Sequence, residues 1–144
     1  MAINPDGTAS FALPRAELGQ GITTAVAMVI ADELEFPLDK VSITLSDARP
    51  ELEFNQLTGG SNSMHVLYDQ VGVAAATARG QLAQRAAIQL ETPLLELTLK
   101  KGAVTAPDGR SLSYASLTRA AVAPRTQVPH ERAPELVRGP APCS

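Results

Sequence analysis

Residues 8–45 read TASFALPRAELGQGITTAVAMVIADELEFPLDKVSITL, and this stretch decides the fold. Its two ends alternate between apolar and small or polar residues, a pattern typical of strands that are buried on one face. Between them, apolar residues recur at helical spacing until a proline disfavours further helix. We therefore expect a strand over 8–13, a helix from Gly21 to about Phe36, and a strand over 41–45. The residues that carry the helical spacing are Ile22, Val26, Val29, Ile30 and Leu34.

A second helix and a hairpin are expected beyond this unit. Residues 47–63 show no periodicity, and long irregular loops inside compact domains are usually functional or disordered. Helical spacing returns over 64–90, with many alanines that indicate close packing. Alternating leucines predict a strand over 95–99, which turns back into a second strand over 103–105. A short helix capped by a serine is expected over 113–121.

The order strand, helix, strand, helix, hairpin, helix predicts an α+β fold with α/β-like character. We expect a mixed sheet with two main helices packed on it, followed by a C-terminal hairpin and a short helix. The 144 residues are enough for one domain with a real core. We place this domain at 1–123. Residues 124–144 contain five prolines and no core of their own, so we expect them to be extended or disordered.

The composition excludes several classes of protein. The net charge is −3, and aromatic residues make up 3% of the chain, which argues against a nucleic-acid or anionic-membrane partner. Cys143 is the only cysteine, so neither an internal disulfide nor a cysteine metal site can form. The first residues show no signal-peptide pattern, which leaves a cytoplasmic or periplasmic location open. No cluster of side chains has metal-ligand spacing.

Two glycine-bearing loops carry the functional signal. Residues 19–21 (GQG) and 58–63 (TGGSNS) each stand where a helix is expected to begin. Helix starts leave backbone N–H groups without partners, and the helix dipole places positive potential there. Such junctions can bind an anion. Two of them in one small domain indicate a ligand with at least one phosphate or an equivalent negative group.

The side chains of the loops suit a polar ligand. Gln20 offers an acceptor and two donors, while Ser61 and Ser63 supply hydroxyl groups beside accessible glycine N–H groups. Two simpler explanations remain open. Gly19 and Gly21 can serve only to allow a tight turn, and the second loop can be an ordinary helix start capped by one of its serines. The second loop is not a P-loop, because no Gly-Lys-Ser/Thr follows.

Several short stretches occur in an order that resembles a known family. Taken together they resemble the molybdenum-binding subunit of the xanthine oxidase/aldehyde oxidase family, and within it the branch of the isoquinoline 1-oxidoreductase β-subunits. The likeness covers most of the chain, and the ordered combination is more specific than any single motif. The stretches are 17–24 (ELGQGITT), 31–34 (ADEL), 58–63 (TGGSNS), 101–104 (KGAV) and 135–140 (ELVRGP).

The resemblance implies a molybdopterin cofactor, which bacterial members commonly carry in its cytosine dinucleotide form. It implies that Gln20, with Gly21 beside it, contacts the cofactor. It also implies that Ser61 and Ser63, with Asn62 between them, contact the pterin and its phosphate.

The resemblance also implies an activity and partners. Enzymes of this family hydroxylate aldehydes or N-heterocycles with oxygen from water, and they pass electrons to iron–sulfur centres in a partner subunit. The implied partners are the remainder of a large molybdenum subunit, an iron–sulfur subunit and a small aldehyde or N-heterocycle substrate. The family's catalytic glutamate is absent from these residues, so we name no catalytic residue and expect no catalysis by the chain alone.

A second hypothesis belongs to a different class of protein. The chain can instead be a non-enzymatic binding or assembly module that keeps the fold without the cofactor. An apolar patch left exposed by missing neighbours would make such a domain self-associate.

Overall fold

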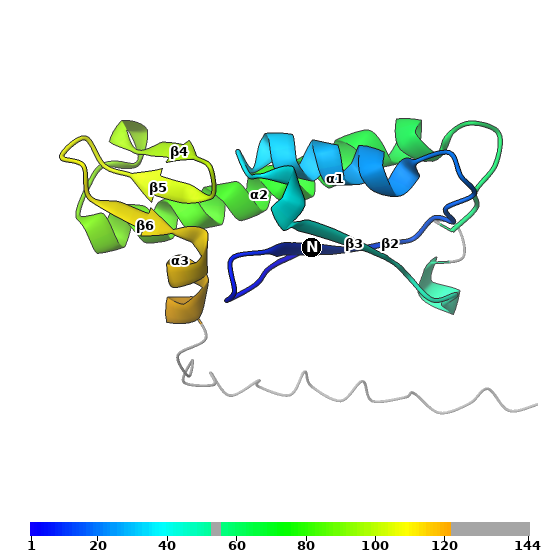
Figure 1. Cartoon of the computed structure of the whole chain (residues 1–144), viewed down its shortest axis with the longest axis horizontal. Helices are drawn as coiled ribbons and strands as arrows, with labels where there is room; N and C mark the ends of the chain where they lie inside the picture. Colours follow the sequence, from blue (N-terminus) through cyan, green and yellow to red (C-terminus); the bar gives the residue numbers. More distant parts are fainter. Residues whose placement is uncertain (53–55, 122–144) are drawn as a thin grey trace, which may run out of the picture.

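The computed structural model describes residues 1–52 and 56–121, which form two small sheets and three helices (Figure 1). The tail expected to be extended, 124–144, and the motif at 135–140 lie outside these residues. The domain boundary at residue 123 therefore stays a prediction.

The first sheet contains the strand–helix–strand unit that residues 8–45 predict. Its strands are β1 (Ala2–Ile3), β2 (Ala9–Leu13) and β3 (Val41–Leu45), in that order across the sheet. β1 runs antiparallel to β2, and β2 runs parallel to β3, so the predicted mixed sheet is confirmed. Helix α1 (Ile22–Glu33) supplies the crossover that two parallel strands require.

Helix α1 packs its apolar stripe into the core and ends before the predicted position. Glu35 adopts a left-handed backbone conformation with φ 52°, and the N–H of Phe36 donates to the carbonyl of Ala31 at 2.8 Å. Together they form a Schellman motif, which closes the helix before the proline is reached. The helix therefore ends at Glu33 instead of near Phe36. Its buried side chains are Ile22, Val26, Ala27, Ile30 and Ala31.

Helix α2 (Ser63–Leu90) joins two hydrophobic cores. Its first half packs beside α1 over the first sheet, and its second half packs against the second sheet (Figure 1). The helix is long enough for both contacts because it rises about 1.5 Å per residue over 28 residues. Its buried residues are Leu67, Val71 and Ala75 in the first core, and Leu82, Ala86 and Leu90 in the second.

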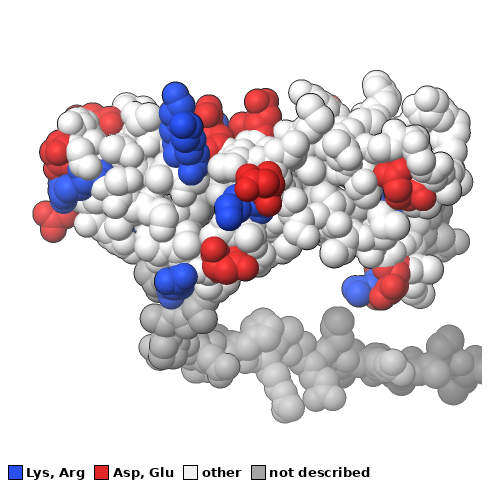
Figure 2. Space-filling view, viewed as in Figure 1, with Lys and Arg blue, Asp and Glu red and all other residues white. Residues whose placement is uncertain are grey.

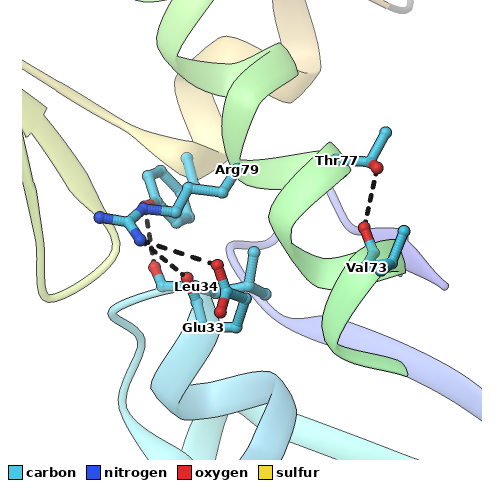
Figure 3. A network of polar contacts seen from close by, with 6 residues as sticks. Glu33, Leu34, Val73, Thr77 and Arg79 are labelled. Atoms are coloured by element: carbon cyan, nitrogen blue, oxygen red, sulfur yellow. Dashed lines mark hydrogen bonds and ion pairs between the residues drawn. The ribbon is translucent and has the colours of Figure 1, made fainter. Parts of the chain in front are cut away.

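Arg79, near the middle of α2, contacts the C-terminal end of α1 (Figure 3). Its Nη1 lies 3.8 Å from Oε1 of Glu33 and donates to the Glu33 carbonyl at 3.4 Å. Both side chains are more than one-third exposed, so this ion pair contributes about 0–1 kcal/mol. The ion pair links the middle of α2 to the end of α1, close to the turn that leads from α1 toward the second core.

The second sheet is antiparallel and is followed by a short helix. Strands β4 (Thr98–Lys100) and β5 (Ala103–Thr105) form the predicted hairpin, and β6 (Ser111–Ser113) adds a third strand. Helix α3 (Tyr114–Ala121) begins directly after β6. The third strand was not predicted, because three residues are too few to show alternation.

The predicted strand over 95–99 is wrong in its first half. Residues Leu94–Glu96 form a 3₁₀ turn, in which the N–H of Leu97 donates to the Leu94 carbonyl at 3.3 Å. Pro93 directly precedes the turn, and the side chain of Leu95 is 98% exposed. Alternating leucines therefore did not mark a buried face here.

Further 3₁₀ turns lie on either side of β3, at Leu38–Lys40 and Pro50–Leu52.

Charged side chains do not gather into one patch on the face shown in Figure 2. Acidic and basic groups stand among a larger uncharged surface. None of the helices within 1–52 and 56–121 is both long enough and apolar enough to cross a membrane.

Candidate functional site

The two glycine-bearing loops lie at the same end of the molecule. Figure 1 shows that α1 and α2 both begin where the parallel strands β2 and β3 end. The segment before the first loop contacts the second loop, since the N–H of Ala16 donates to Oγ1 of Thr58 at 2.9 Å and the Ala16 carbonyl accepts from Nε2 of Gln20. Open sheets with parallel strands bind ligands beyond the carboxyl ends of these strands. The structure therefore brings the two predicted halves of the site together.

The side chain of Gln20 is held against its own loop and faces solvent in part. Its Nε2 donates to the carbonyl of Ala16 at 2.8 Å, and its Oε1 accepts from the N–H of Leu18. A primary amide has two N–H bonds and two acceptor lone pairs. Gln20 is exposed, so one N–H and one lone pair remain for a ligand.

The carboxylate of Glu17 occupies the start of α1. Its Oε1 accepts from the N–H groups of Gly19 at 2.9 Å and Gly21 at 3.0 Å. Its Oε2 accepts from the N–H of Thr23 at 3.1 Å and from Oγ1 of Thr23 at 3.0 Å. These hydrogen bonds, that from the Thr23 N–H above all, lower the pKa of Glu17 from 4.5 to about 2.

The lowered pKa of Glu17 predicts that the free energy of unfolding depends on pH. The pKa is lower in the folded state than in the unfolded chain, so the stabilisation is fully present above about pH 4.5. It is lost as the pH falls through about 2. We expect Glu17→Gln to be less stable than wild type at pH 7, and the difference to be smaller at pH 3. Urea denaturation at both pH values measures the difference. An equal difference at both would contradict the lowered pKa, because the other acids are unchanged in the variant.

The second loop reaches α2 through two left-handed residues. Gly60 has φ 62° and Ser61 has φ 57°, and a left-handed serine costs about 1 to 2 kcal/mol relative to ordinary backbone. Asn62, not a serine, is the N-cap residue, and its side chain makes no capping hydrogen bond. The simpler explanation of a serine-capped helix start is therefore wrong. Ser61 is exposed, and Asn62 and Ser63 are half-buried.

Two buried polar atoms at this end lack partners among residues 1–52 and 56–121. They are Oδ1 of Asn62 and Nε of Arg15. Buried polar atoms are normally hydrogen-bonded, and the exceptions in native structures call for an explanation such as an absent ligand. Arg15 is only 5% exposed and directly precedes Ala16, which joins the loops.

Sequence reasoning assigned no role to Glu17 or Arg15. A signal for Glu17 was present, because a carboxylate four residues before Gly21 can fold back onto the N–H groups of a glycine-rich helix start. No comparable signal marked Arg15, whose burial depends on the tertiary packing of the strand end.

An open groove lies away from the loops. It is an open cavity of about 1330 Å³ between α1 and α2, and none of the predicted site residues line it. Met28, Tyr68 and Val73 contribute exposed apolar surface to it. No cluster of three or more potential metal ligands occurs in the part of the chain that the structure describes. The groove combines this apolar surface with charged side chains at its edges, among them Asp32, Asp69 and Lys101.

The fold places the two loops where parallel strands end, which is the position at which ligand-binding domains of this class commonly hold their ligands. Residues 1–136 match the family model of the molybdopterin cofactor-binding domain. The chain is 35% identical over 120 residues to a subunit of nicotinate dehydrogenase from Pseudomonas putida, covering 83% of this chain and 10% of that protein. It is 31% identical over 135 residues to the beta subunit of isoquinoline 1-oxidoreductase from Brevundimonas diminuta, covering 89% of this chain and 17% of that protein.

The fold agrees with a solved structure of this kind. The crystal structure of quinoline 2-oxidoreductase from Pseudomonas putida 86 superposes with a TM-score of 0.66 at 24% identity, covering 83% of this chain and 15% of that chain. The chain belongs to the molybdopterin cofactor-binding domain family, within the xanthine oxidase family. Its expected function as a cofactor-binding domain is confirmed, as is molybdopterin as the cofactor. The chain spans only a small part of the relatives that it matches.

The residues at the loop end fit a pterin cofactor. A pterin presents several donors and acceptors, and its phosphate group is anionic. The free amide positions of Gln20, the unpartnered Oδ1 of Asn62 and the exposed hydroxyl of Ser61 supply neutral donors and acceptors. Arg15 adds a cation at the same end. The donor set therefore suits a polar heterocycle that carries a phosphate.

Proposed function

We propose that this domain holds one side of a molybdopterin cytosine dinucleotide within a hydroxylase that oxidises N-heterocycles or aldehydes. The names of two relatives support the heterocycle class, since they refer to nicotinate and isoquinoline. The bound cofactor would supply the molybdenum centre at which oxygen from water is transferred. The domain supplies binding, orientation and electrostatics for that centre.

The observation that carries the proposal is the hydrogen bond between Ala16 and Thr58. It ties the segment that leads into the first loop to the first residue of the second loop, about forty residues further along the sequence. We assign cofactor binding on this surface to Gln20, Gly21, Ser61, Asn62 and Ser63. Gln20 can pair with an edge of the pterin through its remaining N–H and lone pair. The uncapped start of α2 suits the phosphate.

Removal of the two serine hydroxyls tests this assignment. The chain is co-expressed with the rest of its subunit, and Ser61→Ala with Ser63→Ala is expected to lower the molybdenum content. A hydrogen bond to a charged group contributes about 1.5 to 3 kcal/mol, so each lost bond to the phosphate weakens binding about tenfold or more. Elemental analysis of the purified protein measures the metal. Ser111→Ala, on the second sheet, is the matched control. Unchanged loading in the double variant would refute the assignment of both serines.

The partners follow from the same proposal. Two relatives are named as subunits, which indicates that proteins of this kind work in assemblies. We propose that the partners are the remainder of a large molybdenum subunit and an iron–sulfur subunit. The groove between α1 and α2 is a surface where such neighbours can pack, because it exposes apolar side chains.

The isolated chain is expected to self-associate through this groove. Val73 is 67% exposed and Met28 is 56% exposed, and both line the same groove, where adjoining apolar side chains form a patch that another protein surface can cover. Light scattering is expected to show oligomers for the wild-type chain and a larger monomer fraction for Met28→Lys with Val73→Lys. A lysine at Ile88, which is exposed outside the groove, serves as the control. A monodisperse wild-type monomer would contradict this expectation.

A further inference from the structure

The start of α1 already contains an anion of the protein itself. Glu17 accepts four hydrogen bonds of 2.9 to 3.1 Å, from Gly19, from Gly21 and from both donors of Thr23. Three of these donors are backbone N–H groups. Successive N–H groups that point into one concavity form an anion-binding nest. The carboxylate of Glu17 occupies the position that an external anion would take.

The two glycines of this loop have a conformational role. Gly19 has φ 90° and Gly21 has φ 74°, which side chains rarely adopt. A Cβ at either position would meet no atom within 4 Å, so close packing does not explain the glycines. Their left-handed backbone turns the N–H groups toward Glu17. The glycines are thus needed for the nest, and its N–H groups already donate to Glu17.

Gln20 lies in the sequence between Gly19 and Gly21, whose N–H groups both donate to Glu17. Its side chain is restrained as well, because Nε2 donates to Ala16 and Oε1 accepts from Leu18. Backbone and side chain are therefore fixed by separate sets of hydrogen bonds. Without Glu17, the backbone set would have no acceptor, and three donors at a helix start would be available to any anion.

We propose that Glu17 is a positioning and specificity-determining residue of the cofactor site. It fixes Gln20 for contact with the neutral pterin, and its charge excludes phosphate from the start of α1. Two anions cannot share one set of donors without strong repulsion. The phosphate is thereby directed away from the first loop. This inference deepens the proposed function and rests on it for the identity of the ligand.

Inorganic phosphate is the probe, and the whole 144-residue chain is the sample. Amide resonances are followed by two-dimensional NMR at pH 7 as phosphate is added. In the wild-type chain, the N–H resonances of Gly19, Gly21 and Thr23 are expected to stay unchanged. In Glu17→Ala, the same resonances are expected to shift saturably. Glu17→Gln keeps the shape and removes the charge, and a smaller saturable shift is expected.

The outcomes separate exclusion of phosphate from a purely structural role. If Glu17 only stabilised the loop, its removal would disorder the nest, and no saturable phosphate response would appear. Shifts of these three resonances in the wild-type chain would overturn the proposal, as would their absence in both variants. If Glu17→Ala does not fold, Glu17→Gln decides alone. The experiment contains no cofactor, so its result is independent of the molybdenum content of the serine variants. The assignment of the serines can be refuted while this proposal stands, and this proposal can be refuted while that assignment stands.

Discussion

Replacement of Tyr114 by alanine is expected to lower the free energy of unfolding by about 3 to 5 kcal/mol. Tyr114 is fully buried in the second core, and its ring stacks on Phe36 with centroids 5.7 Å apart and planes 8° apart. Its hydroxyl donates to the carbonyl of Leu34 at 2.9 Å. This one side chain therefore joins α3 to the end of α1. Urea denaturation followed by circular dichroism measures the loss.

The variant Tyr114→Phe separates the contribution of the hydroxyl to stability from that of the ring. It keeps the stacked ring and leaves the buried carbonyl of Leu34 without its donor, at an expected cost of about 1 to 3 kcal/mol. A tyrosine hydroxyl is protonated at neutral pH, and burial raises the pKa of Tyr114 further, so the hydroxyl keeps donating. A loss below about 1 kcal/mol for the alanine variant would show that α3 does not depend on this contact.

The first half of the fold could be predicted because each element there is long enough to show its period. Residues 41–45 alternate over a full strand, and the helix of 22–33 repeats its apolar positions three times. β1 and β6 have two and three residues, which cannot display alternation. The leucines before β4 followed a strand pattern, yet the turn at Leu94–Glu96 leaves Leu95 in solvent. The alternation of leucines over 95–99 therefore did not reveal which of these side chains the rest of the fold covers.

The sequence predicted where the candidate site lies, but it did not predict the hydrogen bonds within the site. Both loops were located from their glycines and from the helices that follow them. The hydrogen bond between Ala16 and Thr58 depends on how α1 and α2 pack side by side, which no local pattern encodes. The same holds for Glu17, whose partners exist only once Gly19 and Gly21 adopt left-handed backbone. The roles of the five predicted cofactor residues stay predictions.

Gly102→Ala is expected to cost about 2 to 5 kcal/mol of unfolding free energy. Gly102 has φ 75°, and a left-handed alanine costs about 1 to 2 kcal/mol. An added Cβ would also lie 2.6 Å from Cε2 and 2.8 Å from Cδ2 of Phe36. Relief of such overpacking typically costs about 1 to 3 kcal/mol. The Phe36 ring cannot move freely, because it is stacked on Tyr114.

The backbone of Gly102 cannot move away either. Its N–H donates to the Glu35 carbonyl at 3.1 Å, and its carbonyl accepts from the N–H of Tyr114 at 2.9 Å. The β4–β5 turn, the end of α1 and the start of α3 therefore meet at this residue. A shift that relieved the clash would weaken one of these bonds, so the cost of the methyl group is expected to appear as lost stability.

Gly109→Ala provides the matched control for this prediction. Gly109 has φ 88° and no atom within 4 Å of an added Cβ, so only the left-handed cost of about 1 to 2 kcal/mol is expected. The excess loss in Gly102→Ala over Gly109→Ala measures the contact with Phe36. In a Phe36→Leu background this excess should shrink, because leucine lacks the ring edge that the methyl group meets, and a double-mutant cycle reports the coupling. Equal losses at Gly102 and Gly109 would contradict the close approach of Phe36 to the turn.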